Sequence, residues 1–386
     1  MNRWVVGTPV LCSVLGFTVW QFARFVDLPM SKPILLDQTA LMEPAHPSQL
    51  AGWSRRGESS NELLFAGDVM QHINQRDDDF SATYAGLKPI LKKADLAAAN
   101  LEFPVNPAAP VGPKIGTVIF NGSIQHVRAL AAAGFGLLST ANNHLFDQGI
   151  EGAESTLRVI DEAGIQAVGS AGMGKAVEVK TLSVRGARIA FAAYTDPPNI
   201  YRQDKNTYTL WPRDWPVNEL NFGEWSGRYR EKGLRYFTRD VAAARESGAD
   251  FIVALVHWGK EWTFQPTDDQ RRAGRDLIDA GFDLVVGGHG HVVCPPEIYR
   301  GRLIAYSLGN LVSDFELMET RLGALLEVRL GRSPESGRLE VVDFLFHPVL
   351  SDRKAANHPV RLLRPDETGE GARAWTLARR VLGRVE

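Results

Sequence analysis

The feature that most constrains the fold of this chain is an alternation, from Glu62 onward, of short apolar runs with longer segments of helical periodicity. Short apolar runs bounded by turn residues are typical of buried strands. These runs are Leu63–Ala66, Leu96–Ala99, Phe135–Leu138, Ile189–Ala193, Phe251–Val256, Leu284–Val286 and Leu303–Tyr306. The sequence therefore predicts a layered α/β fold, in which ligands bind at the carboxyl ends of the strands.

Glycines mark the ends of the helical segments between these runs. Gly134, Gly164 and Gly281 each follow a segment with helical periodicity, as is typical of a helix C-terminus. The predicted helices are Ile124–Ala133, Ala153–Ala163 and Asp269–Ala280. Nearer the C-terminus we expect a strand within Leu339–Phe346 and a solvated amphipathic helix from Gly371 to Val385.

Polar side chains cluster where several of the apolar runs end. The clusters are Asp68 in FAGDVM, Asn100 and Glu102 in AANLEFP, Asn142 to Asp147 in TANNHLFDQG, His257 in LVHWGKEW, and His289 with His291 in GGHGHVV. Each cluster alone is explained by a turn or a core histidine, but their recurrence at one sheet edge is not. Carboxylate, imidazole and amide groups bind borderline divalent cations. The pattern predicts one or two divalent metal ions, with Mn, Zn, Fe and Mg all compatible.

Composition limits the partners. With 386 residues and 44% hydrophobic side chains, the chain can bury one large core or two modest ones. A net charge of -2 with interspersed signs implies no broad basic face, so nucleic acid is not an expected partner. Cys12 and Cys294 do not suggest a disulfide framework; Cys294 is either inert packing or a neighbour of the metal site.

The N-terminal segment predicts a membrane anchor. Trp4 to Ala23 carries no charge and lies between Arg3 and Arg24, a length that can cross a bilayer. An uncleaved signal anchor over residues 1–24 is the favoured interpretation, ahead of a cleaved signal peptide and a buried soluble helix. It predicts a single-pass protein of the cell membrane whose catalytic domain is extracytoplasmic. Residues 25–60 then form a linker to a domain over 61–350, and residues 351–386 form a tail.

Residues 195–236 interrupt the alternation with many aromatic residues and little periodicity. We interpret them as a surface insertion packed on its own aromatic side chains, with a substrate-binding lid as the alternative. The basic residues among them suit an anionic substrate, although charged side chains are usually solvated. The aromatic and basic residues considered are Tyr201, Tyr208, Trp211, Trp215, Trp225, Tyr229, Tyr236, Arg202, Lys205, Arg213, Arg228 and Arg230.

The order of the motifs resembles that of a known family. GDVM, ANLE, ANNHLFDQG, HWGKEW and GGHGHVVCPPEIYRGRLIAYSLGNLVSD closely resemble the capsule-synthesis protein CapA (poly-γ-glutamate synthesis) family of the calcineurin-like metallophosphoesterase superfamily, over about residues 62–315. The resemblance implies a four-layer α-β-β-α sandwich. It also implies a membrane-anchored domain that faces out of the cell.

The resemblance also assigns roles to residues. It makes Asp68 and His291 ligands of a first metal, with Glu102 or Asn100 near the bridging position. It makes Asn143, His257 and His289 ligands of a second metal. His144 matches the histidine that protonates the leaving group, and Asp147 would orient its ring. The implied reaction is hydrolysis by a two-metal centre without a covalent enzyme intermediate.

Two positions depart from the superfamily pattern. Met70 stands where the superfamily has histidine, and Asn100-Leu101-Glu102 replaces the usual aspartate. A thioether is a poor ligand for such metals. The first site therefore holds its ion weakly, recruits His72, or is empty.

The leading functional hypothesis is a metal-dependent hydrolase that acts in synthesis, release or export of an anionic polymer such as capsule or poly-γ-glutamate. The alternatives are a non-catalytic metal-binding subunit of a polymer synthase or export complex, and a generic phosphoesterase on lipid-linked or nucleotide phosphates. Glu261 and Glu297 are either partners of the metal-binding histidines or surface carboxylates. Asn310, in YSLGN, either contacts substrate oxygen or caps a turn.

Overall fold

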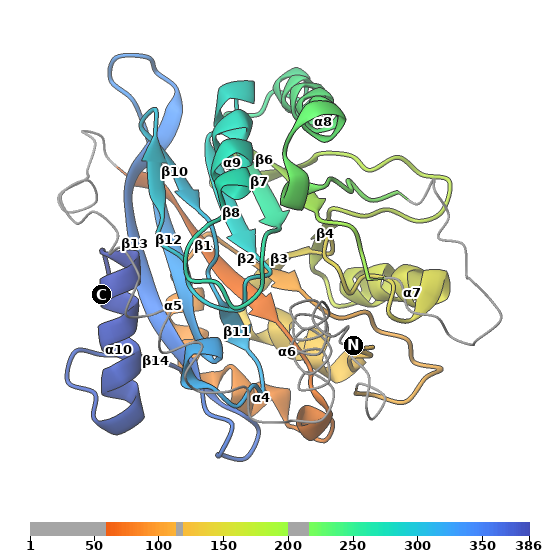
Figure 1. The fold of residues 1–386 in the computed structure, drawn as a ribbon, viewed down its shortest axis with the longest axis vertical. Helices are drawn as coiled ribbons and strands as arrows, with labels where there is room; N and C mark the ends of the chain where they lie inside the picture. The colour runs from red at the N-terminus through yellow and green to blue at the C-terminus, as the bar shows by residue number, and fades with distance from the viewer. Residues whose placement is uncertain (1–58, 113–118, 200–215) are drawn as a thin grey trace, which may run out of the picture.

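The computed structural model describes residues 59–112, 119–199 and 216–386. These residues form a mixed α/β fold with two β-sheets and helices on their outer sides (Figure 1). Every apolar run predicted as a strand overlaps a strand of the structure. Those strands extend a few residues beyond most of the runs, and β10 stops at Ala305, before Tyr306.

The first sheet has the order β14-β13-β12-β1-β2-β3-β4, and the short β11 also pairs with β1. Strands β1, β2, β3, β4 and β11 run parallel to one another where they pair, whereas β12, β13 and β14 pair antiparallel. The bounds are β1 Ser59–Val69, β2 Leu96–Leu101, β3 Phe135–Ser139, β4 Gln166–Val168, β11 Asn310–Val312, β12 Leu322–Arg332, β13 Leu339–Ser351 and β14 Val360–Leu362.

The second sheet has the order β5-β6-β7-β8-β10-β9, with a parallel centre and antiparallel edges. Its strands are β5 Lys180–Val184, β6 Ala187–Thr195, β7 Phe251–His257, β8 Leu284–Gly288, β9 Glu297–Tyr299 and β10 Arg302–Ala305. The carboxyl ends of β1, β2, β7 and β8 therefore lie at one edge of the two packed sheets.

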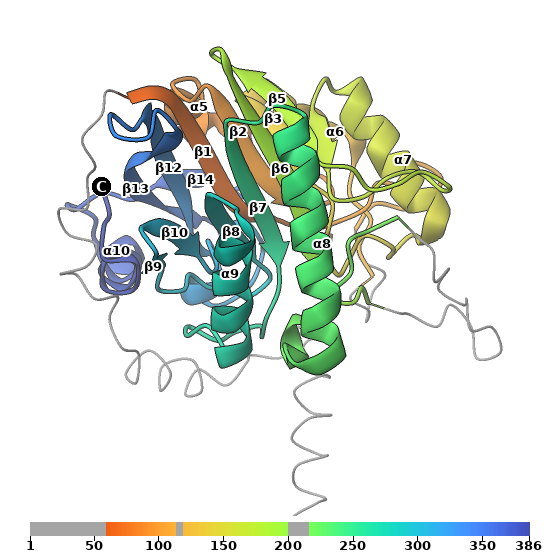
Figure 2. The same cartoon turned by 90° about the horizontal axis from the view of Figure 1, so that it is seen from above.

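Burial explains why the sheets stack. One apolar cluster contains inward-facing residues of both sheets, such as Phe65 and Phe191, and two further clusters lie under the outer helices. Helices α8 and α9 cover the second sheet, and α5, α6 and α7 lie on the side of the first (Figure 2). Phe80 of α4 packs in the same apolar cluster as those three helices. The helices are α4 Phe80–Thr83, α5 Lys88–Leu91, α6 Ile124–Ala133, α7 Gly149–Glu162, α8 Gly227–Glu246, α9 Asp268–Ala280 and α10 Gly369–Leu382, with 3-10 turns at Ile73–Gln75, Ala85–Leu87, Phe222–Glu224 and Met318–Thr320.

Capping chemistry fixes the helices that the sequence predicted. Ser123 Oγ accepts a hydrogen bond from His126 N at the start of α6, and Thr267 with Gln270 forms a capping box on α9. Gly134 and Gly281 end these helices with φ of 119° and 117°. Helix α7 begins at Gly149, four residues before its predicted start at Ala153.

The predicted insertion, 195–236, needs correction at its C-terminal end. Helix α8 begins inside it, and Trp225 stacks between Phe222 and Phe237 in the core against the second sheet. The buried residues of α8 are only Gly233, Phe237, Asp240 and Ala244. The helix therefore has too few apolar residues to show a clear helical periodicity in the sequence. The predicted lid residues of 200–215 lie outside the described residues.

The predicted solvated C-terminal helix is only partly solvated. Ala374, Ala378 and Val381 of α10 are buried in the cluster between the sheets, and Glu386 N bonds to Phe346 O of β13. Strand β14 extends the first sheet. Within the described ranges, no helix is long and apolar enough to cross a membrane, and the predicted anchor lies outside those ranges.

Gly233 is expected to resist substitution, although alanine normally favours helices. A Cβ at this position would lie 2.0 Å from Trp225 Cη2, so Gly233→Ala should displace the indole. We expect a loss of about 1–3 kcal/mol of unfolding free energy, measured by chemical denaturation. The exposed Glu231→Ala on the same helix is the control, expected within about 0.5 kcal/mol of wild type. An equal or higher stability of Gly233→Ala would contradict the packing.

Candidate metal centre

Asp68, at the end of β1, forms hydrogen bonds with residues of both sheets. Its Oδ2 accepts a hydrogen bond from His289 N, at 2.9 Å, across the gap between the sheets. Its Oδ1 accepts one from Asn100 Nδ2, at 2.8 Å, within the first sheet. The side chain is fully buried. Polar residues from both sheets therefore converge on one point, as the strand-end pattern predicted.

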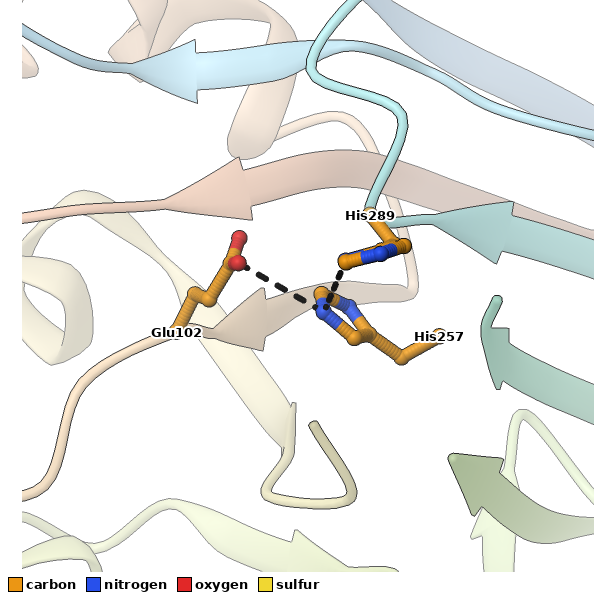
Figure 3. Close-up of side chains that lie close together, drawn as sticks. All are labelled: Glu102, His257 and His289. Atoms are coloured by element: carbon orange, nitrogen blue, oxygen red, sulfur yellow. Dashed lines mark hydrogen bonds and ion pairs between the residues drawn. The ribbon is translucent and has the colours of Figure 1, made fainter. Parts of the chain in front are cut away.

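One group of donors surrounds His257 Nε2. Asn143 Oδ1 lies 2.8 Å from this nitrogen, His289 Nδ1 3.1 Å and Glu102 Oε1 3.4 Å. Figure 3 shows Glu102 and His289 pointing toward the His257 ring from different segments. Two ligand atoms that bind one ion at about 2.1 Å lie roughly 3 to 3.4 Å apart. The spacing of these four donors therefore fits a single divalent ion.

A second group consists of Asp68, Glu102 and His291. Their candidate ligand atoms lie within 4.8 Å of one another, and all three side chains are buried. Glu102 Oε1 is 3.8 Å from His291 Nε2, so Glu102 belongs to both groups. The geometry therefore favours Glu102 over Asn100 as the residue at the bridging position. Oxygen and imidazole donors are typical of divalent transition-metal sites, and the residues present fit one or two such ions.

Asn100 lies beside the donors and orients them. Its Nδ2 donates to Asp68 Oδ1 and is 3.1 Å from His257 Nδ1. Its Oδ1 accepts a hydrogen bond from Asn142 Nδ2, which also donates to Leu101 O. All the polar atoms of the Asn100 amide thus have protein partners. Its predicted role as a metal ligand stays a prediction, and the contacts are those of a residue that positions Asp68 and His257.

The His-Gly-His segment has an unusual backbone. His289 and His291 have φ of 84° and 53°, in the left-handed region that non-glycine residues rarely adopt. Gly288 permits the close approach of this segment to β1, because a Cβ there would lie 2.4 Å from Asp68 Oδ1. The local backbone is therefore held in the conformation that aims both rings at the site.

Burial shifts the pKa values of the candidate ligands Asp68 and His257. It raises the pKa of Asp68 to about 7, with the negative charge of Glu102 as the next cause. Burial lowers the pKa of His257 to about 4, so its ring is neutral near pH 7. A metal ion needs a deprotonated carboxylate and a neutral imidazole. The low pKa of His257 keeps its ring neutral near pH 7, whereas Asp68 would have to lose a proton to bind an ion below about pH 7.

His144 and Asp147 form a separate pair at the edge of the site. His144 Nδ1 lies 2.7 Å from Asp147 Oδ2, which also accepts from Phe120 N. Burial lowers the pKa of His144, but the charge and hydrogen bond of Asp147 outweigh it, so the pKa is raised; Glu102 and Glu261 add to the rise. Neither residue belongs to a donor group. Asp147 therefore lies within hydrogen-bonding distance of the His144 ring, and the roles that the resemblance assigns to the two residues stay predictions.

The structure also shows where the other residues singled out from the sequence lie relative to the donor groups. Met70 is buried in an apolar cluster, and His72 belongs to neither donor group, so the geometry does not support its recruitment. Cys294 is buried, with Sγ donating to Thr263 O, and burial raises its pKa to about 12; of the two alternatives, inert packing is the one that fits. Glu297 is not a partner of the histidines, because it accepts from Tyr306 and Arg275.

Sequence reasoning missed the aromatic surroundings. A series of ring contacts connects His144 to His291, with centroid distances of 4.6 to 5.5 Å. The intervening rings are Phe120, His72, Phe315 and Trp262. Trp262 ends the HWGKEW motif and Phe315 directly follows the last quoted motif, but nothing in their spacing marks them as neighbours in space.

Gly288→Ala should weaken metal binding without unfolding the chain, because its Cβ would press on Asp68. We expect the Mn²⁺ affinity to fall about 10–100-fold, measured by isothermal titration calorimetry. Gly290→Ala is the matched control, since the nearest atom to its Cβ would be Ser307 Oγ at 3.5 Å. Equal affinities of the two variants would show that the approach of β8 to Asp68 is not required.

Metal affinity should depend on pH through Asp68. Because protons compete for this carboxylate below its pKa of about 7, Mn²⁺ affinity should rise about tenfold per unit as pH increases toward 7, and level off above it. Titrations at several pH values test this. His144→Gln should keep the same profile, which excludes His144 as its source. An affinity independent of pH below 7 would contradict the assignment.

Comparisons with known proteins were informative over the same region. The family model described as "Bacterial capsule synthesis protein PGA_cap" matches residues 62–315. "PGA biosynthesis protein CapA" of Bacillus subtilis (strain 168) is 30% identical over 336 residues, covering 81% of this chain and 83% of that protein. "Capsule biosynthesis protein CapA" of Bacillus anthracis is 27% identical over 327 residues, covering 82% and 74%.

A third relative matches less of the chain. "Probable polyglutamine synthesis accessory protein" of Mycobacterium tuberculosis (strain ATCC 25618 / H37Rv) is 30% identical over 195 residues, covering 50% of this chain and 49% of that protein. The family match includes every residue of the two donor groups, and it confirms the resemblance that the motif order indicated. This chain belongs to the bacterial capsule synthesis protein PGA_cap family.

Proposed function

We propose that this protein is a metal-dependent hydrolase that acts in the synthesis, release or export of an anionic surface polymer. The observation that carries the proposal is the sharing of buried Glu102 by two donor groups, with the His144–Asp147 pair beside them. Bridged divalent ions would supply Lewis-acid polarisation of a substrate oxygen. A structural metal site needs neither the second donor group nor the adjacent pair.

His144 is the proton donor in this proposal. Asp147 Oδ2 accepts a hydrogen bond from the Nδ1–H group and fixes the ring, so Nε2 is the atom that exchanges a proton with substrate. The raised pKa of His144 keeps a larger fraction of the ring protonated near neutral pH. A protonated imidazole is the form that can protonate a leaving group.

The aromatic surroundings also suit catalysis. Phe120 packs edge-on against His144 at 4.6 Å, and Phe120 N donates to Asp147. The pair is buried, and Phe120 contacts both of its members. Low water access strengthens the electrostatic effect of Asp147 on the imidazole.

The polymer assignment rests on relatives. The names of the Bacillus proteins refer to PGA and capsule biosynthesis, which supports a poly-γ-glutamate or capsule-type polymer. A polymer synthase complex as partner is part of the proposal and is not named by these relatives. The uncharged segment Trp4–Ala23 supports anchoring in the cell membrane, with the domain outside the cytoplasm. Two stacked sheets flanked by helices also fit a metallophosphoesterase-like sandwich.

Substitution of His144 tests the proposal. In full-length protein loaded with Mn²⁺, His144→Ala should lower turnover of bis-p-nitrophenyl phosphate or poly-γ-glutamate about 10²–10⁴-fold, while calorimetry shows Mn²⁺ still bound. His347→Ala is the control. His347, on β13, contacts the Glu327 carboxylate on β12 and is not among the donor residues. The turnover of His347→Ala should match wild type.

The outcomes separate the hypotheses. Loss of turnover with metal retained supports the hydrolase, and the better substrate separates a polymer hydrolase from a generic phosphoesterase. Bound Mn²⁺ with no turnover of either substrate by wild type would instead favour a non-catalytic metal-binding subunit.

A further inference from the structure

Asn310 begins β11, directly beside Asp68. The two residues pair in parallel register, and the Asn310 side chain is fully buried. Its Nδ2 lies 2.7 Å from Thr320 O, and its Oδ1 lies 3.0 Å from His291 Nδ1. The side chain therefore joins a metal-binding histidine to a backbone carbonyl. Neither role considered from the sequence, a substrate contact or a turn cap, describes these contacts.

The environment determines which way the amide faces. A carbonyl oxygen such as Thr320 O only accepts hydrogen bonds, so the NH₂ group must face it. Ser313 Oγ donates to the same carbonyl at 3.1 Å, which leaves its lone pairs toward Asn310 Nδ2 at 3.4 Å. A reversed amide would bring two oxygen atoms within 2.7 Å of each other. Asn310 Oδ1 therefore faces His291.

The orientation of the amide sets the tautomer of His291. Oδ1 can only accept, so the imidazole proton lies on Nδ1. The carboxylate of Asp68, whose Oδ2 is 3.8 Å from Nδ1, favours the same position for the proton. The ring lone pair is then on Nε2, the nitrogen that lies 3.8 Å from Glu102 Oε1. The nitrogen with the lone pair therefore lies on the side of Glu102, the residue that both donor groups share.

The backbone and neighbouring rings hold His291 in the same orientation. Its φ is 53°, and Trp262 N donates to Gly290 O, at 2.9 Å, just before it. The rings of Trp262 and Phe315 lie 5.1 and 5.3 Å from the imidazole. The backbone and the rings restrict where the imidazole lies, and Asn310 determines which nitrogen carries the proton.

We propose that Asn310 is a positioning residue that holds His291 with its lone pair on Nε2, ready to bind a divalent ion. The inference rests on the proposed metal centre. It does not depend on the hydrolytic reaction, because the tautomer is a property of the metal-free protein.

Nuclear magnetic resonance of histidine side-chain nitrogens tests this in the full-length, metal-free protein, with the His291 signal assigned from His291→Gln. Wild type should carry the proton on Nδ1. Asn310→Leu removes the acceptor and should give a mixture of tautomers, with Mn²⁺ affinity reduced about 10–100-fold. Asn310→Asp retains an acceptor and should keep the Nδ1 proton. Ser313→Ala is the matched control, since it leaves the contact with His291 intact.

Two results would overturn the proposal. One is a proton on Nε2 in wild type, which needs no variant and so holds even if Asn310→Leu fails to fold. The other is a folded Asn310→Leu with an unchanged tautomer and unchanged Mn²⁺ affinity. A proton on Nδ1 of His291 and tight Mn²⁺ binding, without turnover, would instead contradict only the proposed hydrolase function.

Discussion

The carboxylate of Asp68 is the interaction on which the rest of the centre depends. It accepts one hydrogen bond from the first sheet, through Asn100, and one from the second, through His289 N. Burying a carboxylate is costly unless its oxygens have partners, and these two bonds offset part of that cost. They also fix the relative position of the two strand edges. The donor groups exist because the sheets are joined at this point.

The charge on Asp68 opposes folding of the metal-free protein. Its pKa of about 7 lies above the value of about 3.9 expected in an unfolded chain, so the folded state binds more protons between these values. Stability contributed by this group is therefore greatest in acid and falls as pH rises toward 7. A cation bound at this site would reverse this effect by stabilising the carboxylate. The left-handed backbone of His289 and His291 adds a further local cost.

Much of this architecture was predictable because strand ends carry the chemistry. The apolar runs before Asp68, His257 and His289 indicated buried strands, and each is followed by a side chain that can bind a metal. Parallel pairing brings the carboxyl ends of such strands together. Helix α8 was missed, because its buried face has only Phe237 and a few small or polar residues. The role of Asn310 was also hidden. It depends on Thr320 O, a backbone group that has no sequence signature.

The pairing of β1 with β11 and β12 determines when the centre can form. Asp68 lies early in the chain, whereas its partner Asn310 on β11 is made far later, as is β12, which pairs with the earlier part of β1. His291 lies between Asp68 and Asn310 in the sequence. Until those segments have been synthesised, β1 lacks its partners on one side. An incomplete chain therefore exposes an edge and cannot assemble the centre. A chain that ended before His289 would lack residues of both candidate donor groups, so the complete set of donors exists only after most of the second sheet has been made.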